Sequence, residues 1–66
     1  MNLVFDVGNT ETTVGLFDAG TLLGHWRITS DPARTSDEIG VLLLALLAGH
    51  GFDHNAVTGV AIASVV

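Results

Sequence analysis

The chain has 66 residues, with seven acidic and two basic side chains and a formal net charge of −5. Because only Arg27 and Arg34 carry a fixed positive charge, we expect no surface that neutralises nucleic-acid phosphates. The chain has no cysteine, which excludes disulfide bonds and thiolate metal sites. Its longest apolar run, residues 39–49, falls short of the roughly 20 residues that span a membrane. With no signal-peptide pattern at its start, the chain is predicted to be cytoplasmic and to contact no membrane.

The apolar composition is high for so short a chain. Apolar residues make up 48% of it, and the glycines bring that share to about 60%, against roughly 45–50% in ordinary soluble domains. A domain of this size buries only about 60% of its unfolded surface, so it does not need so much apolar sequence. The last residues, Val65 and Val66, also stand within an apolar run. We therefore expect a truncated chain, the N-terminal part of a larger protein.

Three strands are predicted in the first half of the chain. They cover residues 2–7, 11–18 and 21–29. Gly8 and Asn9 separate the first two, and both residue types tolerate the positive φ of tight turns. Ala19 and Gly20 form the second turn. Because short turns join neighbouring antiparallel strands, these three strands should form an antiparallel meander.

One helix is predicted after a loop at residues 30–34. Thr35 and Glu38 have the spacing of a capping box, in which each side chain bonds to the backbone of the other residue. The helix should run to about Ala48, with Gly49 and Gly51 as stop signals. It is apolar on nearly every face, so its outer face should be covered by further chain or by a partner subunit.

The last predicted strand, residues 59–66, is apolar on both faces, as in the covered parallel part of a sheet. The expected order is therefore β-β-β-α-β. The helix would form the crossover that returns the chain to the sheet as a parallel strand. These features predict an α/β fold.

Residues 6–13 contain the side chains and the turn that are most typical of a ligand-binding site. Asp6 at a strand end could hold a hydrated Mg²⁺ through one or two of its waters. Gly8 would let the backbone approach a ligand, and successive N–H groups of a tight turn can bind an anion, with hydroxyl groups as further donors. Those hydroxyls belong to Thr10, Thr12 and Thr13. Together they would form a clamp for a metal–polyphosphate ligand. The pattern alone also fits an ordinary hairpin turn with a flanking acid.

A resemblance favours the clamp. Asp6-Val7-Gly8-Asn9-Thr10 resembles the first phosphate-binding motif of the sugar kinase, Hsp70 and actin superfamily, and more narrowly the start of type III pantothenate kinases. Further similar residues occur along the whole chain. They are His25-Trp26-Arg27, Thr35, Asp37-Glu38, Gly40 and Ala63-Ser64-Val65-Val66.

The resemblance implies transfer of the γ-phosphate of ATP to the 4′-hydroxyl of pantothenate, the first step towards coenzyme A. It implies two ribonuclease-H-like domains of the actin-like ATPase type, of which residues 1–66 would be the N-terminal part of the first. The ATP-binding residues would be Asp6, Val7, Gly8, Asn9, Thr10, Glu11, Thr12 and Thr13, with Asp6 directed towards the metal. It further implies a homodimer and a monovalent cation, K⁺ or NH₄⁺. The cation site, the pantothenate loop and the general base of the family would lie outside this chain, so no catalytic residue is assigned within it.

Two other hypotheses remain open from the sequence: an actin- or Hsp70-like ATPase that acts as a switch or in assembly, and a regulatory accessory protein.

The chain departs from the family pattern at Glu11, where asparagine is usual. A second carboxylate facing a triphosphate would be unfavourable, so we expect Glu11 on the opposite face of its strand. Ile39 replaces an aromatic residue of the family, which should affect packing more than chemistry.

The remaining polar candidates are interpreted as structural. His50 and His54 should lie in a solvated loop, and Trp26 should pack in the core. Arg34 could contact a substrate anion or remain in solvent.

Overall fold

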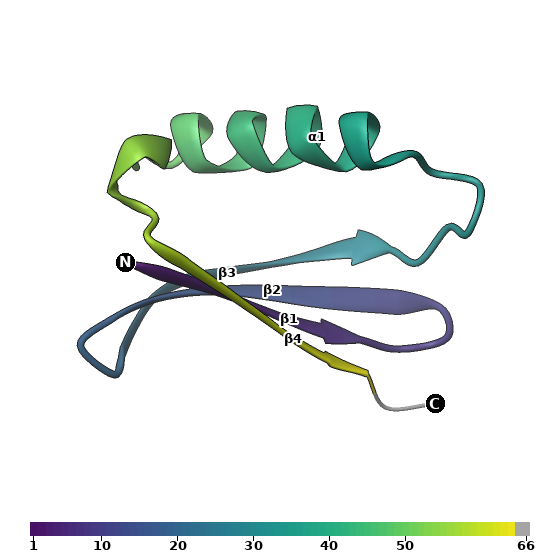
Figure 1. Ribbon diagram of the computed structural model, residues 1–66, viewed down its shortest axis with the longest axis horizontal. Coiled ribbons are helices and arrows are strands. Elements are labelled where there is room, and N and C mark those ends of the chain that lie inside the picture. The colour runs from purple at the N-terminus through teal and green to yellow at the C-terminus, as the bar shows by residue number, and fades with distance from the viewer. Residues whose placement is uncertain (65–66) are drawn as a thin grey trace.

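The computed structural model describes residues 1–64 and forms two layers, a sheet and one helix that covers one face of it (Figure 1). The strands and helices have the following bounds: β1 Asn2–Val7, β2 Glu11–Asp18, β3 Thr21–Thr29, α1 Ser36–Gly49, the short 3₁₀ helix η1 His54–Ala56, and β4 Gly59–Ser64. The predicted strand bounds at 2–7, 11–18 and 21–29 are confirmed. η1 was not predicted.

The sheet has the strand order β3-β2-β1-β4. β2 pairs antiparallel with both β1 and β3, whereas β4 pairs parallel with β1. This arrangement confirms the predicted antiparallel meander, the crossover through α1 and the α/β fold. It agrees with the expected actin-like half-domain. The end of the predicted last strand, Val65 and Val66, lies outside the described residues.

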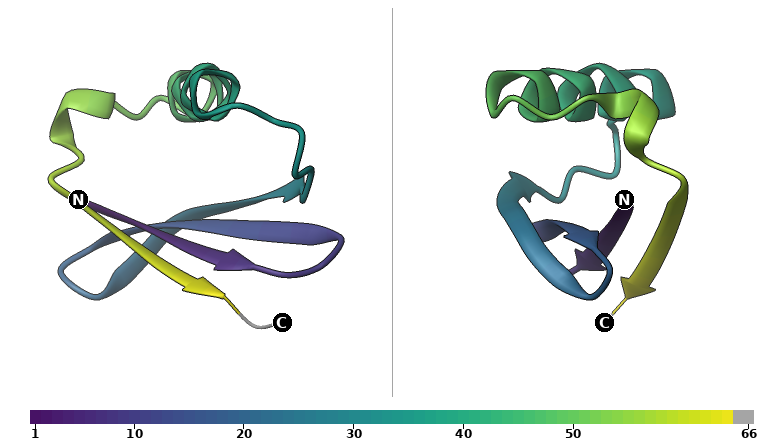
Figure 2. Two further views of the ribbon diagram at one scale, coloured as in Figure 1. Left: turned by 45° about the vertical axis from the view of Figure 1, so that its right-hand side comes forward. Right: turned by 90° about the vertical axis from the view of Figure 1, so that its left-hand side faces the viewer.

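The core forms where the C-terminal half of α1 meets the centre of the sheet. Its buried side chains are Leu3, Val14, Leu16 and Leu47. Burying a leucine side chain stabilises a fold by roughly 1.5–3 kcal/mol. The outer face of α1 has no cover within residues 1–64, since Val41 is 70% exposed, and Figure 2 shows the helix on one side of the sheet only. The predicted uncovered helix face is therefore present.

Both ends of α1 are capped as expected. The Thr35 hydroxyl accepts a hydrogen bond from the Glu38 N–H at 3.2 Å, and Glu38 Oε1 accepts one from the Thr35 N–H at 2.9 Å. These bonds, the backbone one foremost, hold the pKa of the Glu38 carboxyl below its ordinary value. At the other end Gly51 has φ +79, and the Phe52 N–H donates to Leu47 O at 2.9 Å. This is the Schellman arrangement, which satisfies carbonyl groups that the last turn leaves unpaired.

The two turns of the meander differ from each other. Asp18 pairs with Thr21, so Ala19 and Gly20 form a two-residue turn. Their φ angles are +50 and +81, as a type I′ hairpin turn requires. Gly8 and Asn9 separate β1 from β2 as expected, but neither residue has the positive φ that its type tolerates.

Within residues 1–64, no helix is long and apolar enough to cross a membrane.

Candidate functional site

The β1–β2 hairpin closes through a hydrogen bond from the Gly8 N–H to Glu11 O at 2.9 Å. This close approach depends on glycine. A Cβ at position 8 would lie 2.8 Å from Glu11 O, nearer than real Cβ atoms come to a backbone oxygen. Gly8 is thus required for steric reasons rather than for a left-handed conformation.

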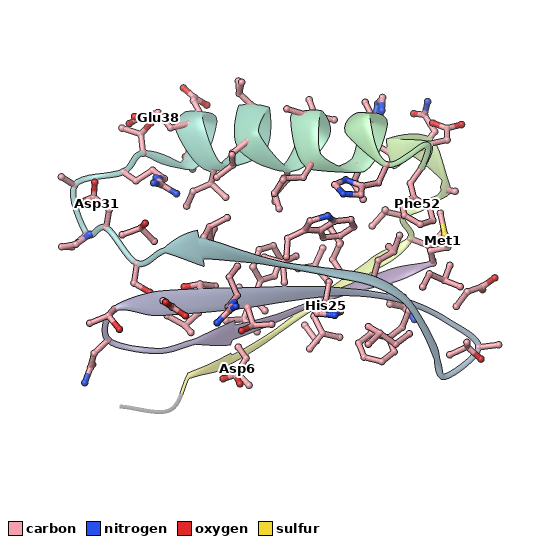
Figure 3. All side chains as sticks on the ribbon, turned by 180° about the vertical axis from the view of Figure 1, so that it is seen from behind. Met1, Asp6, His25, Asp31, Glu38 and Phe52 are labelled. Atoms are coloured by element: carbon pink, nitrogen blue, oxygen red, sulfur yellow. The ribbon has the colours of Figure 1, made fainter. Side chains whose placement is uncertain are left out.

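The face of the sheet opposite α1 carries the charged residues of the hairpin. Asp6 pairs with Thr13, and Thr13 pairs with Arg27, so the three side chains form one row across β1, β2 and β3. Figure 3 shows Asp6 on the side of the sheet away from the helix. We call this surface the open face. All three residues are exposed, so an outside ligand can reach them.

Glu11 also lies on the open face, because it stands two residues before Thr13 on the same strand. The expectation that it would point to the opposite face is therefore wrong. Its Oε2 lies 3.6 Å from Arg27 Nη1. The Arg27 guanidinium offsets part of the extra negative charge, although such an exposed pair contributes only about 0.2–1 kcal/mol.

The remaining predicted binding residues divide between the two faces of the hairpin. Asn9 and Thr10 lie exposed at the turn, and neither of their backbone N–H groups donates to a partner within residues 1–64. Val7 faces the helix side and is half-buried. Thr12 is only 6% exposed, and its hydroxyl lies 2.8 Å from the Ser30 hydroxyl. The structure thus leaves Asp6, Thr10 and Thr13 accessible, with Thr12 turned inward.

Sequence reasoning missed Ser30. It follows β3 directly, and its hydroxyl donates to Gly8 O at 2.8 Å while its N–H donates to Thr10 O at 2.9 Å. The signal that could have found it is a hydroxyl residue directly after β3, the strand that pairs with β2 of the hairpin. That signal is visible only once the β2–β3 register is known.

An open apolar groove of about 640 Å³ lies between the N-terminal half of α1 and the sheet. Gly8 and Asn9 reach its rim, and Arg34 lines it. Arg34 Nη1 is buried and has no hydrogen-bond partner within residues 1–64, so of the two alternatives left open for Arg34, solvent is wrong for this nitrogen. The groove lies on the helix side of the sheet and is not lined by Asp6 or Thr13 of the open face, although it reaches the turn at Gly8 and Asn9.

The aromatic and histidine residues have structural roles at the other end of the molecule. Trp26 packs against the core as expected. His50 lies exposed in the turn after α1, as expected for a solvated loop residue. It also caps α1: its Nδ1 lies 2.8 Å from Leu46 O, and its ring meets Trp26 edge-on at 5.2 Å between centroids. His54 begins η1 rather than lying in a loop.

The described part of the chain contains no group of three His, Cys, Asp or Glu side chains that could enclose a metal ion. Asp6 fits a different kind of site. Mg²⁺ keeps several waters and commonly takes one or two carboxylates together with the phosphates of a substrate. Asp6 is exposed, and among residues 1–64 the one ion pair is that of Arg27 with Glu11, so the Asp6 carboxylate is available for such a role.

A model of the type III pantothenate kinase family matches residues 2–66, nearly the whole chain. The chain belongs to the type III pantothenate kinase family. Curated relatives align with this chain over all 66 residues. Type III pantothenate kinase 2 of Symbiobacterium thermophilum is 52% identical. The type III pantothenate kinases of Desulfotalea psychrophila and Myxococcus xanthus are each 47% identical.

In each case the match covers 100% of this chain but only 25% or 26% of the relative. The chain thus spans about a quarter of the length of the type III pantothenate kinases that it matches.

Proposed function

We propose that this chain supplies the phosphate-binding hairpin of an enzyme that transfers the γ-phosphate of ATP to the 4′-hydroxyl of pantothenate. The observation that carries the proposal is the row of Asp6, Thr13 and Arg27 on the open face, beside the glycine turn. Membership of the type III pantothenate kinase family supports this activity over the ATPase-switch and accessory-protein hypotheses.

Each accessible group has a distinct part in the proposed site. Asp6 would hold Mg²⁺ through its carboxylate, and the metal would neutralise charge on the phosphates. The Asn9 and Thr10 N–H groups and the hydroxyls of Thr10 and Thr13 would donate to phosphate oxygens. Phosphoryl transfer needs chiefly positioning and charge stabilisation, and the start of β2, paired with both β1 and β3, would supply the positioning.

Arg27 and Glu11 would adjust the charge of the same face. A guanidinium within reach of a polyphosphate favours binding, whereas a carboxylate there opposes it. Their 3.6 Å contact partly cancels both effects. The proposal therefore gives Arg27 a supporting role and treats Glu11 as a tolerated departure from the usual asparagine.

Several further features belong to the same proposal and rest on the family alone. They are residues 1–66 as the first part of a ribonuclease-H-like domain, a homodimer, a cytoplasmic location, and a requirement for K⁺ or NH₄⁺ bound outside this chain. The groups that recognise pantothenate and remove its hydroxyl proton would also come from outside it.

The test uses a chimera in which this chain replaces the matching 66-residue segment of the Symbiobacterium thermophilum kinase, to which it is 52% identical. Formation of 4′-phosphopantothenate from ATP is followed by mass spectrometry, first in potassium and then in sodium. The proposal predicts potassium-dependent transfer at a rate within about tenfold of the unaltered relative. ATP hydrolysis without phosphorylation of pantothenate would contradict it and favour the switch hypothesis.

A further inference from the structure

Ser30 joins the end of β3 to the β1–β2 turn through three hydrogen bonds. Its hydroxyl donates to Gly8 O at 2.8 Å and lies 2.8 Å from the Thr12 hydroxyl. Its N–H donates to Thr10 O at 2.9 Å. Both side-chain bonds are partly buried, where competition from water is weaker.

The direction of the hydroxyl chain follows from proton count. A serine hydroxyl has one hydrogen to donate, and that of Ser30 goes to Gly8 O. The Thr12 hydroxyl must therefore be the donor in its bond to Ser30. The hydrogen bonds thus run from the Thr12 hydroxyl through the Ser30 hydroxyl to the Gly8 carbonyl, and successive bonds of this kind polarise and strengthen one another.

These two linked hydrogen bonds fix the peptide group between Gly8 and Asn9. The peptide is planar and trans, so the N–H of Asn9 points away from the Gly8 carbonyl. Because Ser30 holds that carbonyl, it also sets the direction of the Asn9 N–H, which has no partner within residues 1–64. A fixed, unpaired N–H at an exposed turn is the kind of donor that binds an anion.

We propose that Ser30 is a positioning residue of the nucleotide site: it orients the Gly8–Asn9 peptide so that the Asn9 N–H meets a phosphate of ATP. Thr12 acts through Ser30 and does not contact the nucleotide. This inference rests on the proposed function, since it presupposes that the hairpin binds ATP.

The test measures the affinity of the chimera for Mg·ATP by calorimetry, together with KM for ATP, KM for pantothenate and kcat. Ser30→Ala should weaken Mg·ATP binding roughly three- to tenfold, the worth of one oriented hydrogen bond. KM for pantothenate should stay unchanged. Ser30→Thr keeps the hydroxyl and should restore most of the affinity. Ser36→Ala, at an exposed serine just beyond the helix cap, is the matched control and should have no effect.

Thr12→Val separates the two ways in which Thr12 could act. If Thr12 works through Ser30, its loss weakens Mg·ATP binding about two- to threefold alone and adds nothing to Ser30→Ala in the double variant. An additive double variant would show a direct contact between Thr12 and the nucleotide and would overturn that part of the proposal.

The remaining outcomes also decide between the two proposals. Unchanged Mg·ATP affinity in Ser30→Ala, or equal rises in both KM values with a lowered melting temperature, would overturn the positioning role. If the chimera binds Mg·ATP with the expected Ser30 dependence but does not phosphorylate pantothenate, the positioning role stands and the proposed function fails. If it binds no Mg·ATP, both fail.

Discussion

The β1–β2 turn and the β2–β3 turn each place a glycine shortly after an aspartate, at Asp6 and Gly8 and at Asp18 and Gly20, yet their backbones differ. The second turn is a two-residue hairpin with positive φ at Ala19 and Gly20, and a Cβ at Gly20 would meet nothing within 4 Å. The first turn has no positive φ and needs glycine because of the close Glu11 carbonyl.

The surroundings of the two turns differ as much as their backbones. Ser30, which follows β3, donates hydrogen bonds to Gly8 and Thr10 of the first turn. The exposed N–H groups of that turn face solvent. The second closes within itself. The second turn reverses the chain through left-handed backbone, whereas two carbonyl groups of the first turn accept hydrogen bonds from Ser30. This contrast supports the proposal that the first turn binds the phosphates.

The largest expected effect is at Asp6, with Asp18 as its counterpart beside the second turn. In the chimera, Asp6→Asn should lower kcat/KM for ATP about 100- to 1,000-fold, the loss typical for one preorganised electrostatic contact. The fold should be unchanged, since Asp6 is exposed. Asp18→Asn, beside the second turn, is the control and should change kcat/KM less than twofold. Comparable losses in both variants would remove the distinction between the turns.

The two glycines should give the next largest effect. Gly8→Ala forces the Glu11 carbonyl to move and should weaken Mg·ATP binding about tenfold, with roughly 1–3 kcal/mol lost from the free energy of unfolding. Gly20→Ala should cost about 1–2 kcal/mol for its positive φ and leave Mg·ATP affinity unchanged. Calorimetry and denaturant unfolding measure the two quantities. Reduced affinity in Gly20→Ala would show that the second turn also serves the nucleotide.

Glu11→Asn should have a smaller effect of opposite sign. It removes a carboxylate from the open face and frees Arg27, so KM for ATP should fall about two- to fivefold, consistent with an exposed pair. Arg27→Gln should raise it. Both effects should shrink at high salt, because exposed charges are screened. A rise of KM in Glu11→Asn would mean that the carboxylate itself contributes to binding.

The smallest effect should be at the helix start, away from both turns. The pKa of Glu38 is lower in the folded chain than its ordinary value of 4.5. Its bonds therefore stabilise the fold above that value, and this stability is lost as the pH falls through the folded-state pKa. Glu38→Gln should flatten the acid side of a plot of melting temperature against pH between 3 and 7, without changing Mg·ATP affinity. An unchanged plot would show that the capping box contributes no acid-dependent stability.

Much of the fold could be predicted from local sequence. The bounds of the first three strands, the Ala19-Gly20 turn and the Thr35–Glu38 box depend on neighbouring residues, and all three predictions are confirmed. The side of the sheet on which Glu11 lies could not be predicted from repulsion alone. It follows from the register that places Thr13 beside Asp6.

The site was harder to predict than the fold, because part of it depends on contacts between residues that lie far apart in the sequence. The aspartate, the glycine and the exposed hydroxyls could be found as a motif, because they are adjacent in sequence. The contact between Thr12 and Ser30, on which the proposed role of Ser30 rests, is a hydrogen bond that joins residues 18 positions apart. Likewise, the contact between Trp26 and His50 spans 24 positions. Local patterns carry no information about such pairs.

The most direct test of the difference between the turns is hydrogen–deuterium exchange of the chimera, with and without Mg²⁺ and a non-hydrolysable ATP analogue. Bound nucleotide should slow exchange in peptides that cover residues 8–13, while peptides over residues 17–22 exchange at unchanged rates. Protection of the second turn alone, or of neither turn, would contradict the assignment of the phosphate site to the hairpin that Ser30 holds.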